Sequence, residues 1–287
     1  DVLINRCAGA QVYSSLDASQ AYFTIPLSKS SRPFTAFQTS TGLWEFLKLP
    51  FGVSTAVSIY SRFIAMVLNP LGSRNINFYL DDILIFSHDL ESHLARLEEV
   101  LAAHARAGIK LKAAKCQLFV QKVTYLGHEL SPEGVGMVEE YVQRVLEWPV
   151  PKSPKELSRF LGFVGYYREF IKDFSGLTEE MSAQKRKKTL DWTAVMDEKF
   201  VKLKEAFRCA PLRAGPDFES EKPFVLTTDF SGGAVSAILS QEQGGRERLI
   251  AASGRKTTKG ERNYPSWRGE LAALVFGCRK FNHILSF

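Results

Sequence analysis

Apolar and polar residues follow two different rhythms along this chain. In the first 90 residues the apolar positions come in short runs separated by turn residues, which predicts short strands: 22–27, 34–39, 43–49 and 78–86. The last of these runs is strongly apolar but contains Asp81 and Asp82. Neighbouring side chains point to opposite faces of a strand, so one of the two carboxylates would face a core. The pattern therefore predicts a hairpin turn at this pair.

Farther along, apolar residues recur at helical spacing. This spacing predicts helices over 54–68, over 89–107 with Gly108 as the stop, from Ser153 toward Ile171, over 194–208 and over 267–285. Ser153, Pro154 and Glu156 form a capping signal at the start of the third helix. Three more strand patterns lie between the last two helices: 224–230, 234–241 and 248–253.

Turn-rich segments divide the pattern into three parts. The loop 131–136 ends the first part, and the stretch from Pro211 to Pro216 ends the second. We therefore expect domains over 1–136, 137–213 and 214–287. Antiparallel strands with helices in the first part, helices in the second and strands with one helix in the third indicate an α+β fold.

The composition is that of a globular protein, because 45% of the 287 residues are apolar and 12% are aromatic. No run of about 18 apolar residues is present, so we expect no membrane partner. No signal peptide or other targeting signal is visible, and the four cysteines lie far apart. These features favour an intracellular protein, in the cytoplasm or the nucleus.

The net charge of +6 is unevenly distributed. Residues 1–151 hold 13 basic and 14 acidic side chains, a net charge of −1, whereas residues 152–213 hold 14 and 9, a net charge of +5. The basic run 185–188 belongs to this middle segment. Such a run can neutralise phosphates, or it can be an ordinary solvated surface, and the sequence leaves both open.

Asp17 ends a short apolar run, as a strand-end carboxylate would. A carboxylate there, beside a hairpin carrying Asp81 and Asp82, is the ligand set that two-metal phosphoryl transfer requires. Two Mg²⁺ ions, with Mn²⁺ as an alternative, would then lie between these three residues. A surface Asp-Asp turn without chemistry is the alternative interpretation.

A second pair of carboxylates lies near the end of the chain. Asp229 ends an apolar strand pattern, and Glu270 lies in the first turn of the last predicted helix. A strand aspartate facing a helix glutamate would suit a metal-dependent nuclease. The alternatives are a turn aspartate and a glutamate that stabilises the helix N-terminus.

Five segments, in order, resemble motifs of reverse transcriptases, above all those of gypsy-type LTR retrotransposon Pol polyproteins. They are LDASQAYF (16–23), EFLKLPFGVSTA (45–56), FYLDDILIFS (78–87), VTYLGHELSPEGV (123–135) and WPVPKSPKELSRFLGFVGYYREFI (148–171). The resemblance implies a polymerase palm with remnant fingers over 1–136 and a helical thumb and tether over 137–213. It also implies templated DNA synthesis by two-Mg²⁺ nucleotidyl transfer to a primer 3′-hydroxyl, with an RNA template, a DNA primer and deoxynucleoside triphosphates as partners.

Carried over residue by residue, the resemblance assigns three groups of roles. Catalysis and metal binding fall to Asp17, Asp81 and Asp82. Nucleotide binding falls to Tyr22, Phe51 and Gly52, with the Tyr22 ring excluding a 2′-hydroxyl. Primer positioning falls to Tyr125, Leu126, Gly127 and His128.

The segments 223–241 and 262–285 resemble the ribonuclease H domain fused to such polymerases, which implies a truncated mixed sheet with one helix over 214–287. The resemblance makes Asp229 and Glu270 metal ligands acting on an RNA–DNA hybrid. Phe230 replaces the family's usual alanine beside Asp229, and the family's next aspartate is not within the sequence. We therefore expect a segment incomplete at both ends, with little or no nuclease activity.

Two other functions stay open at this stage. An inactive or domesticated retroelement remnant would act as a nucleic-acid-binding protein. A residual hybrid nuclease would depend on Asp229 and Glu270 alone.

Overall fold

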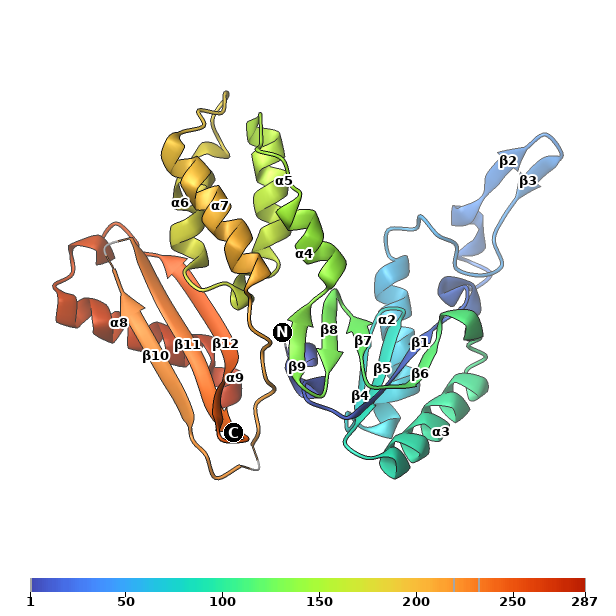
Figure 1. The fold of residues 1–287 in the computed structure, drawn as a ribbon. Helices are drawn as coiled ribbons and strands as arrows, with labels where there is room; N and C mark the ends of the chain where they lie inside the picture. The colour runs from blue at the N-terminus through green and yellow to red at the C-terminus, as the bar shows by residue number, and fades with distance from the viewer. Residues whose placement is uncertain (1, 219, 232, 287) are drawn as a thin grey trace. The chain divides into compact units, whose positions relative to one another are not determined.

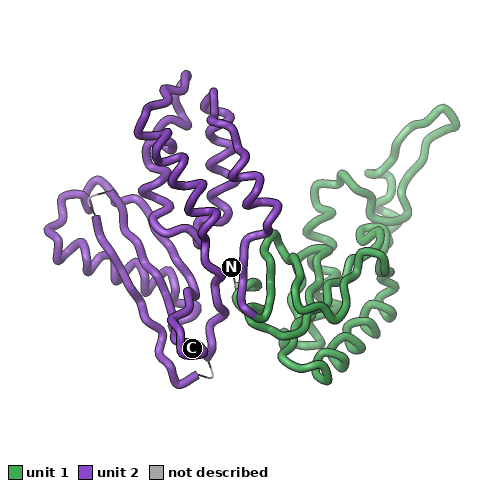
Figure 2. Tube along the Cα trace, viewed as in Figure 1, with its two compact units in different colours: residues 1–132 green, residues 133–287 purple. Residues whose placement is uncertain are grey.

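The computed structural model describes residues 2–218, 220–231 and 233–286, and its helices and strands are drawn in Figure 1. The chain divides into two compact units, residues 1–132 and residues 133–287 (Figure 2). The three-part division expected from the sequence differs from this one and stays a prediction. None of the helices in the described ranges is long and apolar enough to span a membrane.

A four-stranded sheet forms the centre of unit 1. Its strands are β1 (Val12–Asp17), β4 (Ile76–Tyr79), β5 (Asp82–Ser87) and β6 (Gln117–Val120), in the order β4-β5-β1-β6. Each neighbouring pair is antiparallel. The helices α2 (Ala56–Leu68) and α3 (Leu90–Arg106) supply the remaining long elements of the core.

One face of this sheet is held by a compact apolar core. Leu16 and Ile83 from the central strands pack in one cluster with Tyr60 and Ile64 of α2 and Val100 of α3, and each is at most 2% exposed. Burying an aliphatic side chain of this size contributes roughly 1.5–3 kcal/mol. The two helices therefore cover the same face of the sheet.

The caps of α3 agree with the sequence pattern. The Asp89 side chain accepts a hydrogen bond from the Ser92 backbone N–H at 2.8 Å, and Gly108 follows the helix with a φ of +69°. The helix predicted over 89–107 is thus confirmed to within a residue at each end.

The shorter elements of unit 1 differ more from expectation. They are α1 (Val2–Cys7), η1 (Ala21–Thr24), η2 (Arg32–Thr35), β2 (Phe37–Thr39), β3 (Gly42–Trp44), η3 (Asn69–Leu71), η4 (Ala113–Lys115), β7 (Val123–Tyr125) and β8 (His128–Ser131). The strand predicted over 22–27 is wrong, because the chain there forms the 3₁₀ turn η1. The strands predicted over 34–39 and 43–49 shrink to the three-residue pair β2 and β3, which does enclose Thr41.

Unit 2 begins with β9 (Gly134–Met137) and continues through helices: α4 (Glu139–Leu146), α5 (Pro154–Gly165), η5 (Arg168–Phe170), α6 (Phe174–Gln184) and α7 (Ala194–Arg208). The predicted capping signal is confirmed, since Ser153 Oγ accepts from the Glu156 N–H at 3.2 Å. The sequence pattern did not predict α4 or α6, and α5 ends before Ile171.

The rest of unit 2 is a three-stranded sheet with a helix packed on it. The sheet joins β10 (Phe224–Phe230), β11 (Ala234–Gln243) and β12 (Arg246–Lys256), and η6 (Glu261–Asn263), α8 (Ser266–Lys280) and α9 (Asn282–Leu285) follow. These strands pair antiparallel, whereas a mixed sheet was expected for this region. The α+β class expected from the sequence is confirmed.

Glycines let α8 lie close to the sheet. A Cβ atom at Gly269 would collide with the Phe230 ring, and one at Gly277 would come within 3.1 Å of Ala237 Cβ and Leu226 Cδ1. Phe230 and Leu226 therefore face α8. Because strand residues alternate between faces, Asp229 lies on the opposite face of β10.

Two buried histidines should make the free energy of unfolding depend on pH. His93 bonds Ser14 and Ser87 through its two ring nitrogens, at 2.8 and 3.2 Å, and His104 Nδ1 donates to the Val100 carbonyl at 2.7 Å. Burial lowers the pKa of both, although Asp89 partly opposes the shift at His93. Both are therefore kept neutral in the folded chain more strongly than in the unfolded chain.

We expect the free energy of unfolding to fall as the pH drops below about 6.5, by up to about 1.4 kcal/mol per pH unit for each histidine. Above that pH both states are neutral and the dependence vanishes. Urea unfolding between about pH 7.5 and 5.5 measures the slope, and His93→Gln with His104→Gln should reduce it. His283→Gln, at an exposed histidine, is the control. An unchanged slope in the double variant would refute the assignment.

Candidate active site

The strand register brings two of the three predicted catalytic carboxylates directly opposite each other. Asp17, the last residue of β1, pairs with Asp82, the first residue of β5. Asp82 also pairs with Tyr79 across the β4–β5 hairpin, so the two-residue turn of that hairpin is Leu80-Asp81. The turn predicted at Asp81-Asp82 is thus displaced by one residue, and Asp82 belongs to the strand.

The turn has an unusual backbone. Leu80 has a φ of +55°, in the left-handed region that side chains other than glycine rarely adopt. A two-residue hairpin needs a positive φ at its first central residue because the flanking strands twist. Such a conformation costs on the order of 1–3 kcal/mol and persists where the surrounding structure imposes it. The turn is held in place by the strands on both sides of it.

Burial and neighbouring charges change the ionisation of Asp81 and Asp82. Burial raises the pKa of Asp81, and the charges of Asp82 and Asp17 raise it further. Burial and Asp17 likewise raise the pKa of Asp82. The Oδ1 atom of Asp81 is buried and accepts no hydrogen bond from the described residues. An acceptor in that position is costly unless a proton or a cation satisfies it.

One cation of the chain already lies beside this cluster. Lys115 Nζ, at the end of η4, is 3.6 Å from Asp17 Oδ2. The segment that carries it is fixed by backbone bonds, since the Lys112 N–H donates to the Asp17 carbonyl at 2.9 Å and the Ser19 N–H donates to the Lys110 carbonyl at 2.7 Å. Lys115 offsets part of the negative charge, but it does not contact Asp81.

The donor set suits a hard divalent cation in its chemistry. Carboxylate oxygens are the ligands that Mg²⁺ and Mn²⁺ prefer, and one oxygen of Asp81 has no hydrogen-bond partner among the described residues. In the described part of the chain, no three acidic, histidine or cysteine side chains converge tightly enough to form a metal site as they stand. Binding would therefore draw the three side chains together around a backbone that is already in register.

An aromatic cluster lies next to Asp81. The Tyr22 ring packs against Phe51, with centroids 5.2 Å apart, and against Tyr60 at 5.3 Å. Burial and the Asp81 charge raise the pKa of both tyrosines. Phe51 is 64% exposed. Gly52, the next residue in the same turn, has a φ of +88°. The structure thus groups the predicted nucleotide-binding residues beside the acidic cluster.

The predicted primer-positioning residues form the tight β7–β8 hairpin. Tyr125 pairs with His128, and the two turn residues Leu126 and Gly127 both have positive φ, at +45° and +70°. His128 Nδ1 donates to the Leu126 carbonyl at 3.0 Å. Burial raises the pKa of Tyr125, with smaller contributions from Cys7 and Asp82, and its hydroxyl is buried without a hydrogen-bond partner in the described ranges. The charge of Asp82 is thus felt at Tyr125, although burial is the main cause of the shift.

The second predicted pair, Asp229 and Glu270, is arranged differently. Asp229 is exposed on the face of β10 that points away from α8, whereas Glu270 is exposed on α8 itself. The helix and the strand thus present these carboxylates on different sides of the sheet.

The sequence pattern did not predict two residues that lie beside the three aspartates. Lys115 lies 98 positions after Asp17, and only the fold brings it there. Tyr60 lies on the buried face of α2. Its buried hydroxyl, next to Asp81, has no hydrogen-bond partner among the described residues. A tyrosine in an otherwise aliphatic stripe is the one sequence signal that could have indicated it.

Comparison with protein families gives two matches. Residues 2–130 match the model "Reverse transcriptase (RNA-dependent DNA polymerase)", and residues 192–287 match "RNase H-like domain found in reverse transcriptase". The second match lies entirely within unit 2, and the first lies entirely within unit 1.

Curated relatives resemble nearly the whole chain. The retrovirus-related Pol polyproteins from the Drosophila melanogaster transposons 297 and opus are 33% and 35% identical to it over 99% and 93% of its length. The Tf2-3 polyprotein of Schizosaccharomyces pombe is 30% identical over 99%. The chain spans only 26%, 28% and 21% of these three relatives, respectively.

Solved structures share the fold. A foamy viral protease-reverse transcriptase in complex with double-stranded DNA matches 99% of the chain and 50% of its own with a TM-score of 0.88, at 21% identity. The foamy viral enzyme in complex with an RNA/DNA hybrid matches 99% of the chain and 38% of its own with a TM-score of 0.82, also at 21% identity.

The three aspartates repel one another, so a bound metal ion should stabilise the folded chain. Asp81→Asn removes one charge at nearly constant shape. In the absence of divalent cations, it should therefore raise the melting temperature by a few degrees, which corresponds to about 1 kcal/mol in the free energy of unfolding. It should also abolish most of the stabilisation that Mg²⁺ gives the natural chain, because ligands that bind only the folded state stabilise it.

Differential scanning fluorimetry with and without Mg²⁺ measures both effects. Asp191→Asn, which neutralises an exposed aspartate in unit 2, is the matched control and should change neither. Equal Mg²⁺ stabilisation of the Asp81→Asn variant and the natural chain would rule out a metal site at this cluster.

Proposed function

This chain belongs to the reverse transcriptase family, with an RNase H-like domain of the kind found in reverse transcriptases, and we propose that it is the polymerase segment of an LTR-retrotransposon Pol polyprotein. Its reaction is RNA- and DNA-templated DNA synthesis, in which a primer 3′-hydroxyl attacks the α-phosphate of a deoxynucleoside triphosphate. The observation that carries the proposal is the β1–β5 register, which sets Asp17 opposite Asp82 and leaves Asp81 in the adjoining turn.

The three aspartates act as the ligands of two Mg²⁺ ions. When bound, these ions lower the pKa of the attacking hydroxyl and stabilise the charge on the leaving pyrophosphate. The protein contributes a backbone that already places the three carboxylates at a strand end and a strained turn. The backbone therefore needs little rearrangement during the reaction. Two observations support a cationic partner: the raised pKa values of Asp81 and Asp82, and the Oδ1 atom of Asp81, which has no hydrogen-bond partner in the described part of the chain.

The aromatic cluster forms the nucleotide pocket. Tyr22 is wedged between Phe51 and Tyr60, so its ring cannot move aside easily when a sugar lies against it. A fixed ring at that point leaves no room for a 2′-hydroxyl, which favours deoxynucleotides. Gly52 brings the backbone close to the nucleotide without a side chain in the way.

The β7–β8 hairpin positions the primer terminus. Its turn residues Leu126 and Gly127 both adopt a positive φ, which fixes the direction of the loop. The buried Tyr125 and His128 side chains anchor its two strands by packing.

Nucleic acid is accordingly the partner, as an RNA template annealed to a DNA primer. Two foamy viral enzyme structures that share the fold contain double-stranded DNA and an RNA/DNA hybrid, respectively. A remnant that only binds nucleic acid would not need Asp17, Asp81 and Asp82 to remain in register. Retention of all three favours the polymerase over that alternative.

A primer-extension assay on an RNA template tests the proposal. Asp81→Asn and Asp17→Asn should each lower the extension rate by at least about 100-fold, because metal-assisted charge stabilisation is worth several kcal/mol. Asp229→Asn, which removes a carboxylate from the other unit, should leave the rate unchanged. Retained extension in both palm variants would contradict the proposal.

The nuclease is the weaker candidate because Asp229 and Glu270 lie on different sides of the sheet. We expect the natural chain not to cut an RNA–DNA hybrid in the presence of Mg²⁺. Asp229→Asn should therefore make no difference in this assay. Gel analysis of a labelled hybrid measures this directly. Cutting that disappears in the Asp229→Asn variant but persists in Asp81→Asn would establish the nuclease instead.

A further inference from the structure

A cavity of about 510 Å³ lies within unit 2, between α6 and the sheet β10-β11-β12. Its floor is the sheet face turned away from α8, with Thr227 and Asp229 of β10 and Ser236 of β11. Its roof is the first part of α6 and the segment before it. The volume falls in the range of small-molecule sites.

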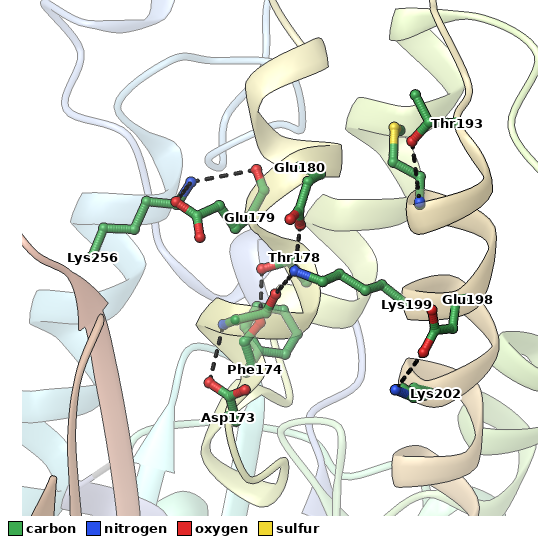
Figure 3. A network of polar contacts seen from close by, with 12 residues as sticks. Asp173, Phe174, Thr178, Glu179, Glu180, Thr193, Glu198, Lys199, Lys202 and Lys256 are labelled. Carbon is green, nitrogen blue, oxygen red and sulfur yellow. Dashed lines mark hydrogen bonds and ion pairs between the residues drawn. The ribbon is translucent and has the colours of Figure 1, made fainter. Parts of the chain in front are cut away.

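Polar contacts hold α6, which covers the cavity, to β12 and to α7 (Figure 3). Lys256, at the end of β12, contacts Glu179 of α6 through both the carboxylate, at 3.7 Å, and the backbone carbonyl, at 3.4 Å. Lys199 of α7 holds α6 from its other side, bonding Glu180 at 2.6 Å and the Gly176 carbonyl at 2.9 Å. The space is therefore preformed, which lowers the cost of filling it.

Some of the charged side chains that line the cavity have no partner of opposite charge among the described residues. Asp173 is engaged, because it caps α6 through the Gly176 N–H at 3.2 Å. Arg168 and Lys172 line the cavity and have no ion pair or side-chain hydrogen bond to any residue in the described ranges, and the same holds for Asp229. The nearby basic residues of α7 differ, since Lys199, Lys202 and Arg208 each pair with a glutamate.

The remaining lining combines hydroxyls with apolar surface. Within the described residues, the hydroxyls of Ser175, Ser182, Thr227 and Ser236 have no hydrogen-bond partner. Phe174 and Ile171 supply apolar area beside them. A ligand that fits must offer an anion, several hydroxyls and a flat apolar part.

We propose that this cavity binds a nucleoside monophosphate, with the phosphate at Arg168 and Lys172 and the ribose hydroxyls at Asp229. A guanidinium and an ammonium are the side chains best suited to a phosphate. A carboxylate accepts hydrogen bonds from a ribose diol, as it does in dinucleotide-binding folds. The base then lies against Phe174 and Ile171, where apolar contact stabilises it.

Isothermal titration of the full chain with AMP tests this site, in EDTA so that no metal ion assists binding elsewhere. The comparison probes are adenosine, inorganic phosphate and 2′,3′-dideoxy-AMP. AMP should bind at least about tenfold more tightly than each of the three, because each lacks one of the recognised groups.

Two variants separate the contacts. Arg168→Ala with Lys172→Ala should weaken AMP at least about tenfold without changing adenosine. Asp229→Asn should weaken AMP but not 2′,3′-dideoxy-AMP. The control Lys187→Ala with Lys188→Ala removes the same charge from an exposed turn outside the cavity and should change nothing.

The proposal fails if AMP does not bind, or if the control variant weakens AMP as much as the Arg168 and Lys172 pair does. It also fails if Tyr22→Ala abolishes AMP binding, which would place the ligand in the other unit. Phosphate that binds as tightly as AMP would overturn the assignment of the ribose and base. Photolabelling with 8-azido-AMP should modify peptides from 168–182 or 227–238, and labelling confined to other peptides would refute the site.

Discussion

The antiparallel register between β1 and β5 is the constraint on which the polymerase-like site depends. The same two strands carry Leu16 and Ile83 into the core and place Asp17 and Asp82 side by side where the two strands meet the turn. Because side chains alternate along a strand, a slip of one residue would turn the apolar residues toward water. Apolar packing therefore holds the register, and the register gathers carboxylates that repel one another.

In unit 2, by contrast with the three clustered aspartates of unit 1, several charged side chains lie next to a charge of opposite sign. The four basic side chains of α7 pair with glutamates or donate to carbonyls, and Arg213 is buried in an ion pair with Glu169 at 3.1 Å. Arg213 also exchanges two backbone hydrogen bonds with Val135, at 2.7 and 2.8 Å, which ties β9 to the segment before the last sheet. Arg168 and Lys172, which line the cavity, have no such partner among the described residues, and their position beside that cavity is what points to a binding site.

Much of this organisation could be predicted from the sequence because its signals were local. The helices α3 and α7 have regular apolar spacing and side-chain caps at Asp89 and Thr193, and the strands β10 to β12 are long and bounded by turns. Other features depended on distant parts of the chain. The segment 22–27 has strand-like composition, but η1 forms there because Ala21 and Tyr22 pack against the helix side of the core. The contact of Lys115 with Asp17 and the cavity under α6 arise from tertiary packing, which no local pattern records.

Phe230 and Gly269 carry a consequence for how this sequence can change. The phenylalanine occupies the space that a side chain at the glycine would need, so the two positions behave as a single steric unit. A larger residue at 269 becomes acceptable only after the ring at 230 has been replaced by something small. The order in which substitutions arrive therefore matters here, and related chains should vary at these two positions together rather than independently.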